Sequence, residues 1–412
     1  MKNTATQKEK YFWNMMGSFS NALSSMVLAI IVNRLTGAEL GGIFAFAFSN
    51  AQLMMTIGAF EVRPLQSTDV DEKYSFTQYF SLRLITCTLM ILIDLAYIWF
   101  SGYTGVKAYT VFLVCIYKMV EGFTDVFSGM FQQHDRIDLV GKSLTLRIFV
   151  CTAGFFLVLY ATKNLVWASL ALGLISAALI FIYDLRLWKY FDNVKIGVEF
   201  RQLLPLVWEC LPLFISSFIM MYINNAPKYA INQMYPDEIQ NIYNILFMPA
   251  FVINLFSLFV FRPMLVNLTK EWNERNLKPF VKTVKYILLL IIILTILAMG
   301  AAYLLGIPIL QIIYGVDISG YRTELVLIMV TGGISALSTF MYYVITVMRI
   351  QKYLLVGYLS AFVIALFLPG ILVKKYIIAG AVYSCAASLI VLTMVFLLII
   401  ISNVMHVKRE IR

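Results

Sequence analysis

Three charged side chains lie in the interior of a single apolar stretch of this sequence, residues 107–131. Lys118, Glu121 and Asp125 follow one another at i, i+3 and i+7, so they share one face of a helix. An ionised side chain in the middle of a membrane span costs about 2.5–3.5 kcal/mol on insertion scales, so this face must point inward. One interpretation is a structural pair of Lys118 with Glu121. The other is ion exchange during transport by Glu121 or Asp125, because neighbouring carboxylates repel each other and burial disfavours their charged forms.

Two further kinds of polar side chain, a carboxyl and several amides, lie in other apolar stretches. Asp94, within residues 79–100, is a candidate for ion coupling, and a buried carboxyl with satisfied hydrogen bonds is the competing interpretation. Amide side chains are frequent in the first, second, seventh and eighth stretches, and Asn224 is one of them. Most amides at such places join helices through hydrogen bonds. Some could instead bind sugar hydroxyls.

One segment with basic residues near its ends occurs twice, 199 residues apart (238 − 39). Glu39-Leu40-Gly41-Gly42-Ile43-Phe44, Phe48 and Arg63-Pro64 recur as Glu238-Ile239-Gln240-Asn241-Ile242-Tyr243, Phe247 and Arg262-Pro263. A five-residue insertion also places Arg34 on Lys228. We interpret the copies as a duplicated helical hairpin. The four basic residues, Arg34, Lys228, Arg63 and Arg262, then either reach the lipid headgroups or face a central cavity, where arginine forks suit phosphate oxygens.

The elements that position these groups must be membrane helices. The chain has 412 residues, of which 61% are hydrophobic and 13% are charged, and no soluble fold could bury so much apolar surface. Apolar runs of about 20 residues, enough to cross a hydrocarbon layer of about 30 Å, recur along the whole chain. We predict about twelve spans, near residues 11–33, 41–62, 79–100, 107–131, 144–162, 165–188, 205–226, 241–261, 284–305, 322–347, 353–373 and 377–402.

Lysine and arginine are unevenly divided between the two sides that these spans imply. With the N-terminus inside, 24 of the 32 Lys and Arg residues fall on the cytoplasmic side, which predicts that both termini are cytoplasmic. The net charge of +10 is then mostly a topological signal and gives no reason to expect nucleic-acid binding. We predict an N-terminal six-helix lobe at 1–190, a cytoplasmic linker at 191–204 and a C-terminal six-helix lobe at 205–412, with the substrate cavity between the lobes.

Signals of catalysis or of a cofactor are weak. Gly141-Lys142-Ser143 ends like a phosphate-binding loop, but Arg136 stands where the first glycine should be and no strand precedes it. Asp69-Val70-Asp71 has the spacing of a metal-binding DxD motif, yet it lies in a short charged loop. His134 and His406 offer no metal cluster. We therefore expect a protein that is not an enzyme, has no cofactor or metal, and does not hydrolyse ATP.

Three segments resemble motifs of a known family. Asn33 to Phe44 resembles the first-hairpin motif of bacterial polysaccharide flippases, where an arginine, a leucine-glycine pair and a glycine-aromatic step join spans one and two. Glu61 to Asp69 is similar to the segment after span two in a subgroup of these proteins. In the second half of the chain, two segments resemble the family's counterpart of the first hairpin, namely Pro227 to Ile231 and Glu238 to Pro263. The family often has Asp where Pro227 stands. The family is the polysaccharide transporter (Wzx-type) branch of the multidrug/oligosaccharidyl-lipid/polysaccharide (MOP) exporter superfamily.

This resemblance implies both a fold and a function. The implied fold is an all-α integral membrane protein with two six-helix lobes around a V-shaped central cavity. The implied function is outward flipping of undecaprenyl-pyrophosphate-linked oligosaccharides across the bacterial cytoplasmic (inner) membrane by alternating access, driven by a proton or sodium gradient. The products would be O-antigen, capsule or exopolysaccharide. Implied partners are the lipid-linked oligosaccharide, membrane lipids, and the polymerases and glycosyltransferases of the same process.

Two alternatives to a flippase belong to other functional classes. A multidrug exporter of the same fold would exchange organic cations for protons or sodium ions, but its cavity should be acidic and aromatic, whereas this hairpin carries bases. A membrane glycosyltransferase or polymerase would need an external catalytic domain or a large external loop, and the sequence shows neither.

Overall fold

The computed structural model describes residues 5–69, 71–188, 191, 197–199, 203–261 and 264–410. Over these residues every regular element is a helix, which confirms the all-α prediction. Each predicted span coincides with a helix. Nine helical segments among the described residues are long and apolar enough to cross a membrane, and the last of them contains two of the predicted spans.

Packing of the backbone divides the chain into two units, Met1–Met221 and Tyr222–Arg412. The boundary falls inside α9 (Leu203–Met234), which begins in the first unit and ends in the second. The division into two lobes of six helices stays a prediction, and most of the expected linker 191–204 lies outside the described residues.

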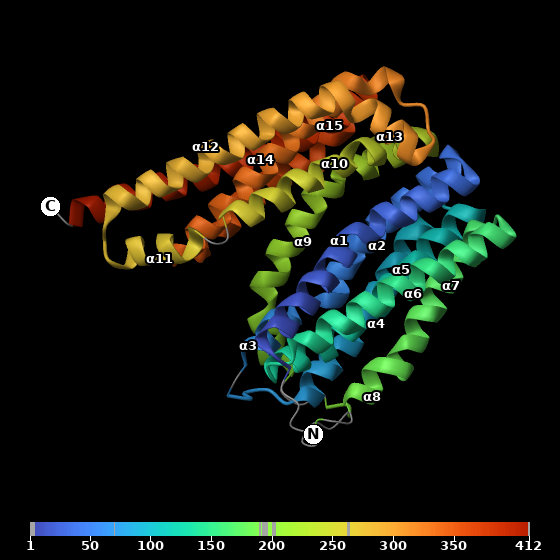
Figure 1. The fold of residues 1–412 in the computed structure, drawn as a ribbon, viewed down its shortest axis with the longest axis horizontal. Helices are drawn as coiled ribbons and strands as arrows, with labels where there is room; N and C mark the ends of the chain where they lie inside the picture. Colours follow the sequence, from blue (N-terminus) through green and yellow to red (C-terminus); the bar gives the residue numbers. More distant parts are fainter. Residues whose placement is uncertain are drawn as a thin grey trace. The chain divides into compact units, whose positions relative to one another are not determined.

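The first unit is a bundle of long helices (Figure 1). Its elements before α9 are α1 (Gln7–Thr36), α2 (Ala38–Ala59), α3 (Val62–Thr68), α4 (Phe76–Phe100), α5 (Gly105–Gln133), α6 (Ile137–Thr162), α7 (Leu165–Leu179), the π-helical turn η1 (Ile180–Asp184) and α8 (Leu185–Trp188). Two of its helices begin at capping boxes. Thr6 and Glu9 exchange hydrogen bonds at the start of α1, and Ser75 and Gln78 do so at the start of α4.

In the second unit, three long elements lie side by side (Figure 1), with α14 packed against both α12 and α15. Its elements after α9 are α10 (Asp237–Phe261), α11 (Leu265–Asn273), α12 (Leu277–Ala301), the π-helical turn η3 (Ala302–Gly306), α13 (Ile307–Tyr314), η4 (Ser319–Tyr321), α14 (Arg322–Val347), η5 (Gln351–Tyr353) and α15 (Leu354–Glu410).

The duplicated hairpin is visible in the two units. Gly37 separates α1 from α2 with φ at +89°, a conformation that favours glycine. Pro236, 199 residues later (236 − 37), stands between α9 and α10. The packing also repeats, because α2 contacts α4 and α5 while α10 contacts α12 and α14. Both the break between the helices and the partners of the second helix therefore recur.

Glycine allows α1 and α6 to pack closely. A Cβ atom on Gly141 would lie 2.1 Å from the carbonyl oxygen of Trp13, and one on Gly17 would lie 3.0 Å from the Gly141 backbone. Such small residues let helix backbones approach each other in membranes. Gly141, the glycine of the phosphate-loop-like sequence Gly141-Lys142-Ser143, is therefore a packing residue in the structure.

The long α15 is a hairpin of two arms. Its helical conformation breaks at Ile377, with φ at 52° and ψ at −119°. A Cβ atom on Gly380 would lie only 2.0 Å from the carbonyl oxygen of Leu372, and the Tyr358 and Phe396 rings are 5.6 Å apart. The arms thus run antiparallel and correspond to the predicted spans 353–373 and 377–402.

Candidate functional site

One face of α5 carries the charged residues expected from the sequence. Lys118 Nζ lies 2.7 Å from Glu121 Oε2, and the two side chains are only 2% and 11% exposed. The structure therefore forms the pair of Lys118 with Glu121. The same ammonium group lies 4.7 Å from the centroid of the Phe48 ring, which comes from α2. A desolvated cation over an aromatic face gains about 2 kcal/mol.

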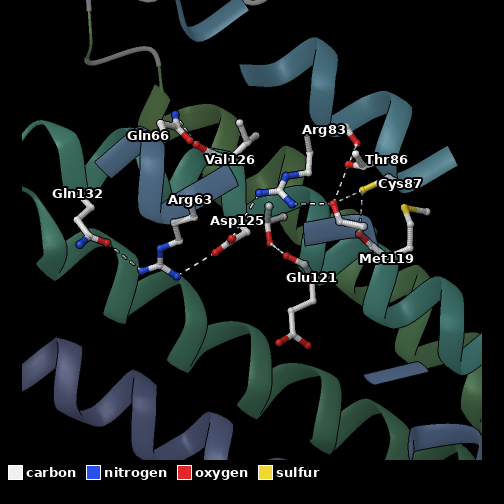
Figure 2. Close-up of polar contacts among 12 residues, drawn as sticks. Arg63, Gln66, Arg83, Thr86, Cys87, Met119, Glu121, Asp125, Val126 and Gln132 are labelled. Atoms are coloured by element: carbon white, nitrogen blue, oxygen red, sulfur yellow. Dashed lines mark hydrogen bonds and ion pairs between the residues drawn. The ribbon is translucent and has the colours of Figure 1, made fainter. Parts of the chain in front are cut away.

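Asp125 lies between two arginines from other elements (Figure 2). Arg63 of α3 donates from Nη1 to Oδ1 at 2.9 Å, and Arg83 of α4 donates from Nη2 to Oδ2 at 3.5 Å. Figure 2 also shows the Glu121 side chain turned away from Asp125. The two acids of this face thus have separate cationic partners, so the charge repulsion considered from the sequence is offset within the first unit.

The sequence analysis did not include Arg83 among the site residues. Its side chain is fully buried, and it also donates to the carbonyl oxygen of Gly58 at 2.7 Å. A buried guanidinium needs such partners because an unpaired charge in an apolar interior is very costly. The available signal was its position inside the predicted span 79–100, where a charged side chain needs a partner.

A second buried ion pair was also missed. Arg147 of α6 pairs with Asp184 of the π-helical turn η1 and donates to Ser176 Oγ at 3.2 Å. Ser143 Oγ donates to the other oxygen of the Asp184 carboxylate. Arg147 and Asp184 both lie within predicted spans, which was the only signal for them. π-helical turns are rare in proteins, and those that occur are often found at functional sites. The ion pair of Arg147 with Asp184 is therefore a second candidate site in the first unit, in addition to the charged face of α5.

Asp94 has a different environment from Asp125. It is completely buried in α4, and Asn50 of α2 donates to its Oδ1 at 2.6 Å. The Cys115 thiol is another polar neighbour, while Oδ2 accepts no hydrogen bond of normal geometry from any described residue. The hydrogen bond from Asn50 agrees with the interpretation of a buried carboxyl that joins helices. Oδ2 could carry an exchangeable proton, because no described residue occupies it with a hydrogen bond.

In the second unit, a buried lysine occupies a place similar to that of Lys118. Lys228 of α9 has its ammonium nitrogen 5.6 Å from the centroid of the Phe247 ring in α10. Phe247 is the duplicate of Phe48, 199 residues later. Asn224 lies one turn before Lys228 on the same face of α9 and is partly buried. Each copy of the hairpin therefore holds a buried lysine against the equivalent aromatic ring, although the lysines come from non-equivalent helices.

The other two basic candidates are Arg34 and Arg262. Arg34 is exposed in the last turn of α1, where a cation complements the helix dipole. Arg262 lies outside the described residues.

The loop that contains the DxD-like sequence has a structural role. Asp69 Oδ1 accepts from the Lys73 amide at 2.8 Å, and Oδ2 accepts from the Tyr74 amide at 3.0 Å and from the Tyr79 hydroxyl at 2.8 Å. Burial raises the pKa of Asp69, but these hydrogen bonds outweigh it and leave the pKa below its usual value. Lys73 and the Tyr74 hydroxyl in turn bind Glu209 of α9. Both oxygens of Asp69 are thus occupied by the protein.

An apolar cavity of about 530 Å³ lies within the second unit, between α10, α12, α13 and α14. Small or ring-shaped residues create the space, namely Pro249, Ala298, Ala302 and Gly306. All the residues that line it are apolar, so the cavity suits hydrocarbon rather than sugar or phosphate.

Comparison with known proteins identifies a family and a relative over most of the chain. The family model described as "Polysaccharide biosynthesis protein" matches residues 8–269. A capsular polysaccharide biosynthesis protein of Staphylococcus aureus, CapF, is 20% identical over 378 residues, which cover 89% of this chain and 92% of CapF.

Solved structures of similar fold are membrane transporters. An inward-facing multidrug resistance transporter of the MATE family in the MOP superfamily matches with a TM-score of 0.65 at 12% identity, covering 98% of this chain and 99% of that one. A MOP superfamily transporter from Pyrococcus furiosus matches with a TM-score of 0.58 at 15% identity, covering 97% and 95%. With its apolar helices and a fold like that of these transporters, the chain is a multi-pass membrane protein that belongs to the polysaccharide biosynthesis protein family.

Proposed function

We propose that this protein flips undecaprenyl-pyrophosphate-linked oligosaccharides outward across the bacterial cytoplasmic membrane, by alternating access, for the synthesis of a surface polysaccharide. Membership of the polysaccharide biosynthesis protein family and the transporter fold support this function. The CapF relative is a capsular polysaccharide biosynthesis protein, which makes capsule one of the candidate products. The protein would then act beside glycosyltransferases and polymerases without being an enzyme itself.

The observation that carries the proposal is the pair of buried lysines at equivalent aromatic rings. Lys118 over Phe48 and Lys228 over Phe247 place one ammonium group against the equivalent ring of each copy of the hairpin. A pyrophosphate is a strong multivalent acceptor, and cationic donors in a dry environment bind it tightly. An organic cation would instead be repelled by the same groups.

Each unit has further candidates for substrate binding. Arg63 and Arg262 in the two hairpin copies, and Arg34 at the end of α1, supply further donors for the pyrophosphate oxygens. Arg63 is suited to this role because its side chain is 31% exposed and can exchange Asp125 for a ligand. Asn224, one turn from Lys228, would donate to sugar hydroxyls.

The energy would come from a proton or sodium gradient acting on Asp94, Glu121 or Asp125. Asp125 and Glu121 each pair with a cation that the pyrophosphate would also attract, so substrate binding would compete with these pairs and change the affinity of the acids for protons. Asp125→Asn or Glu121→Gln should remove the dependence of transport on the gradient. Retention of that dependence in both variants would move the coupling to Asp94.

The deciding experiment measures two activities of the purified protein in proteoliposomes. Movement of a fluorescent undecaprenyl-pyrophosphate oligosaccharide is followed with and without an imposed proton or sodium gradient, beside efflux of a cationic dye. We expect gradient-stimulated movement of the lipid, lost in Lys118→Met and Lys228→Met. Lys107→Met is the matched control, because Lys107 also lies over a ring of α2, Phe46, at 5.8 Å but is only partly buried.

A multidrug exporter remains the second candidate, since the fold is shared with MATE transporters. Dye efflux without lipid movement would establish it, and Asp94, Glu121 and Asp125 would become the cation ligands. The Pyrococcus furiosus relative is described by a binding pocket of reverse polarity that suggests a different function. The buried lysines of this chain favour a similar departure from cation export.

A further inference from the structure

A second cavity of the C-terminal unit, about 620 Å³ in volume, lies where α14 ends and α15 begins. Ile350, Lys352 and Tyr353 of the connection form one wall. The last part of α15 forms the other wall, because the two arms of this helix run antiparallel. We call this space the terminal pocket. The proposed flipping function does not use it.

The α15 residues of the terminal pocket form one stripe that changes in character along the helix. Counted from the first member they lie at i, i+3, i+4, i+7, i+8 and i+11, namely Val395, Leu398, Ile399, Ser402, Asn403 and His406. This spacing keeps all six on one helix face. The stripe is about 16 Å long at about 1.5 Å per residue, and it passes from hydrocarbon to hydrogen-bonding groups within that length.

Positive charge surrounds the polar end of the stripe. Lys352 lines the pocket, with its ammonium nitrogen 5.0 Å from the centroid of the Tyr353 ring. Arg349 is exposed just before this wall, and Lys408 and Arg409 are exposed just after His406. Among the described residues that line the pocket there is no Asp or Glu. The polar end therefore attracts anions, and the apolar end can hold a hydrocarbon chain.

We propose that the terminal pocket binds an anionic phospholipid. The phosphate would lie at Lys352 and His406, and one acyl chain would follow Val395, Leu398 and Ile399. A soluble polyphosphate would leave the apolar half of the stripe uncovered. A zwitterionic lipid would gain less from the surrounding lysines and arginines, each of which contributes about 1 kcal/mol toward an anionic surface. With the predicted orientation, the ligand comes from the cytoplasmic leaflet.

Native mass spectrometry of the full-length protein in detergent tests this assignment. Dioleoyl-phosphatidylglycerol and dioleoyl-phosphatidylethanolamine are titrated separately, and the bound fraction gives each dissociation constant. We expect tighter binding of phosphatidylglycerol, and a loss of roughly fivefold in its affinity for Lys352→Ala. Lys375→Ala is the matched control. It removes the same charge, and Lys375 also lies 5.0 Å from a neighbouring ring, that of Tyr376, at the turn between the arms.

Two further measurements keep the test decisive. Ser402→Trp places a large ring in the middle of the stripe at an exposed position, so it should block phosphatidylglycerol without affecting folding. Equal affinity for both lipids, or equal losses in Lys352→Ala and Lys375→Ala, would overturn the proposal. Displacement of phosphatidylglycerol by a tenfold lower concentration of undecaprenyl pyrophosphate would overturn it as well, because the pocket would then belong to the transported lipid. Lipid binding is measured without flipping, so this result is independent of the transport assay.

Discussion

The ammonium nitrogen of Lys118 lies 4.7 Å from the centroid of the Phe48 ring, and this contact joins α5 to α2 in the core of the first unit. The duplicate of Phe48, Phe247, has Lys228 at 5.6 Å in the second unit. The aromatic positions repeat at a fixed interval, whereas the lysines come from α5 in one unit and from α9 in the other. Each ring therefore has a buried cation, which a different helix supplies in each unit.

Lys118→Met should abolish transport and also destabilise the protein. A double variant, in which Glu121 is changed as well, separates the two effects. The single change leaves the Glu121 carboxylate buried without its cation, which costs about 3–5 kcal/mol. Lys118→Met with Glu121→Gln removes both charges and should restore most of the thermal stability in detergent. Flipping should stay absent in the double variant. Recovery of transport together with stability would show that Lys118 has only a structural role.

Arg83→Met should destabilise the protein more than Arg63→Met, although both arginines bind Asp125. Arg83 is fully buried with two partners, so its loss leaves Asp125 to Arg63 alone and the Gly58 carbonyl to the Thr86 hydroxyl. Losing these charged hydrogen bonds should cost about 1.5–3 kcal/mol. Arg63 is 31% exposed, and its loss should cost about 1 kcal/mol or less. Midpoints of thermal unfolding in one detergent compare the variants. A larger loss for Arg63→Met would contradict this assignment of the two arginines.

Asp94→Asn should preserve the fold while testing ion coupling. The new amide keeps an acceptor for the Asn50 side chain, which donates to Asp94 at 2.6 Å, and has nearly the same volume. The free energy of unfolding should therefore change by about 1 kcal/mol or less. If Asp94 carries the coupling proton, flipping in proteoliposomes will no longer respond to a pH gradient. An unchanged response would leave Asp94 as a residue that joins α4 to α2.

Gly141→Ala should separate α1 from α6. The added methyl carbon would lie 2.1 Å from the Trp13 carbonyl oxygen, and this backbone atom cannot rotate away. The expected loss is about 1–3 kcal/mol, measured as thermal unfolding. Gly300→Ala in α12 is the control, because nothing lies within 4 Å of its added methyl group and alanine is the better helix former. Equal stability of the two variants would refute close packing at Gly141.

The folded conformation of the loop after α3 should depend on the ionised form of Asp69. Its pKa is lowered in the folded protein, so its hydrogen bonds are fully present above the unfolded value of about 3.9 and are lost as the pH falls through the folded value. At neutral pH, Asp69→Ala should have the same effect and speed tryptic cleavage after Lys73 by roughly fivefold. Asp71→Ala, at an exposed position of the same loop, serves as the control. Identical cleavage rates would remove the proposed role of Asp69.

The sequence alone determined the class of the protein, because apolar runs of span length and the charge bias follow directly from what a bilayer accepts. It also located the duplicated hairpin, and the breaks at Gly37 and Pro236 and the packing of α2 and α10 repeat at the same interval. It placed Lys118, Glu121 and Asp125 on one helix face, since helical spacing is a local property. The family assignment from short motifs was confirmed by the match over residues 8–269.

Only the tertiary structure decided which charges meet. Asp125 is 42 residues from Arg83 and 62 from Arg63, and the sequence does not encode how α3, α4 and α5 are turned toward one another. The same holds for Arg147 with Asp184, where a π-helical turn sets the direction of the acid. Burial inside a span signals that a charge must have a partner, because an isolated one is too costly. The identity of the partner is fixed by packing between helices distant in the chain.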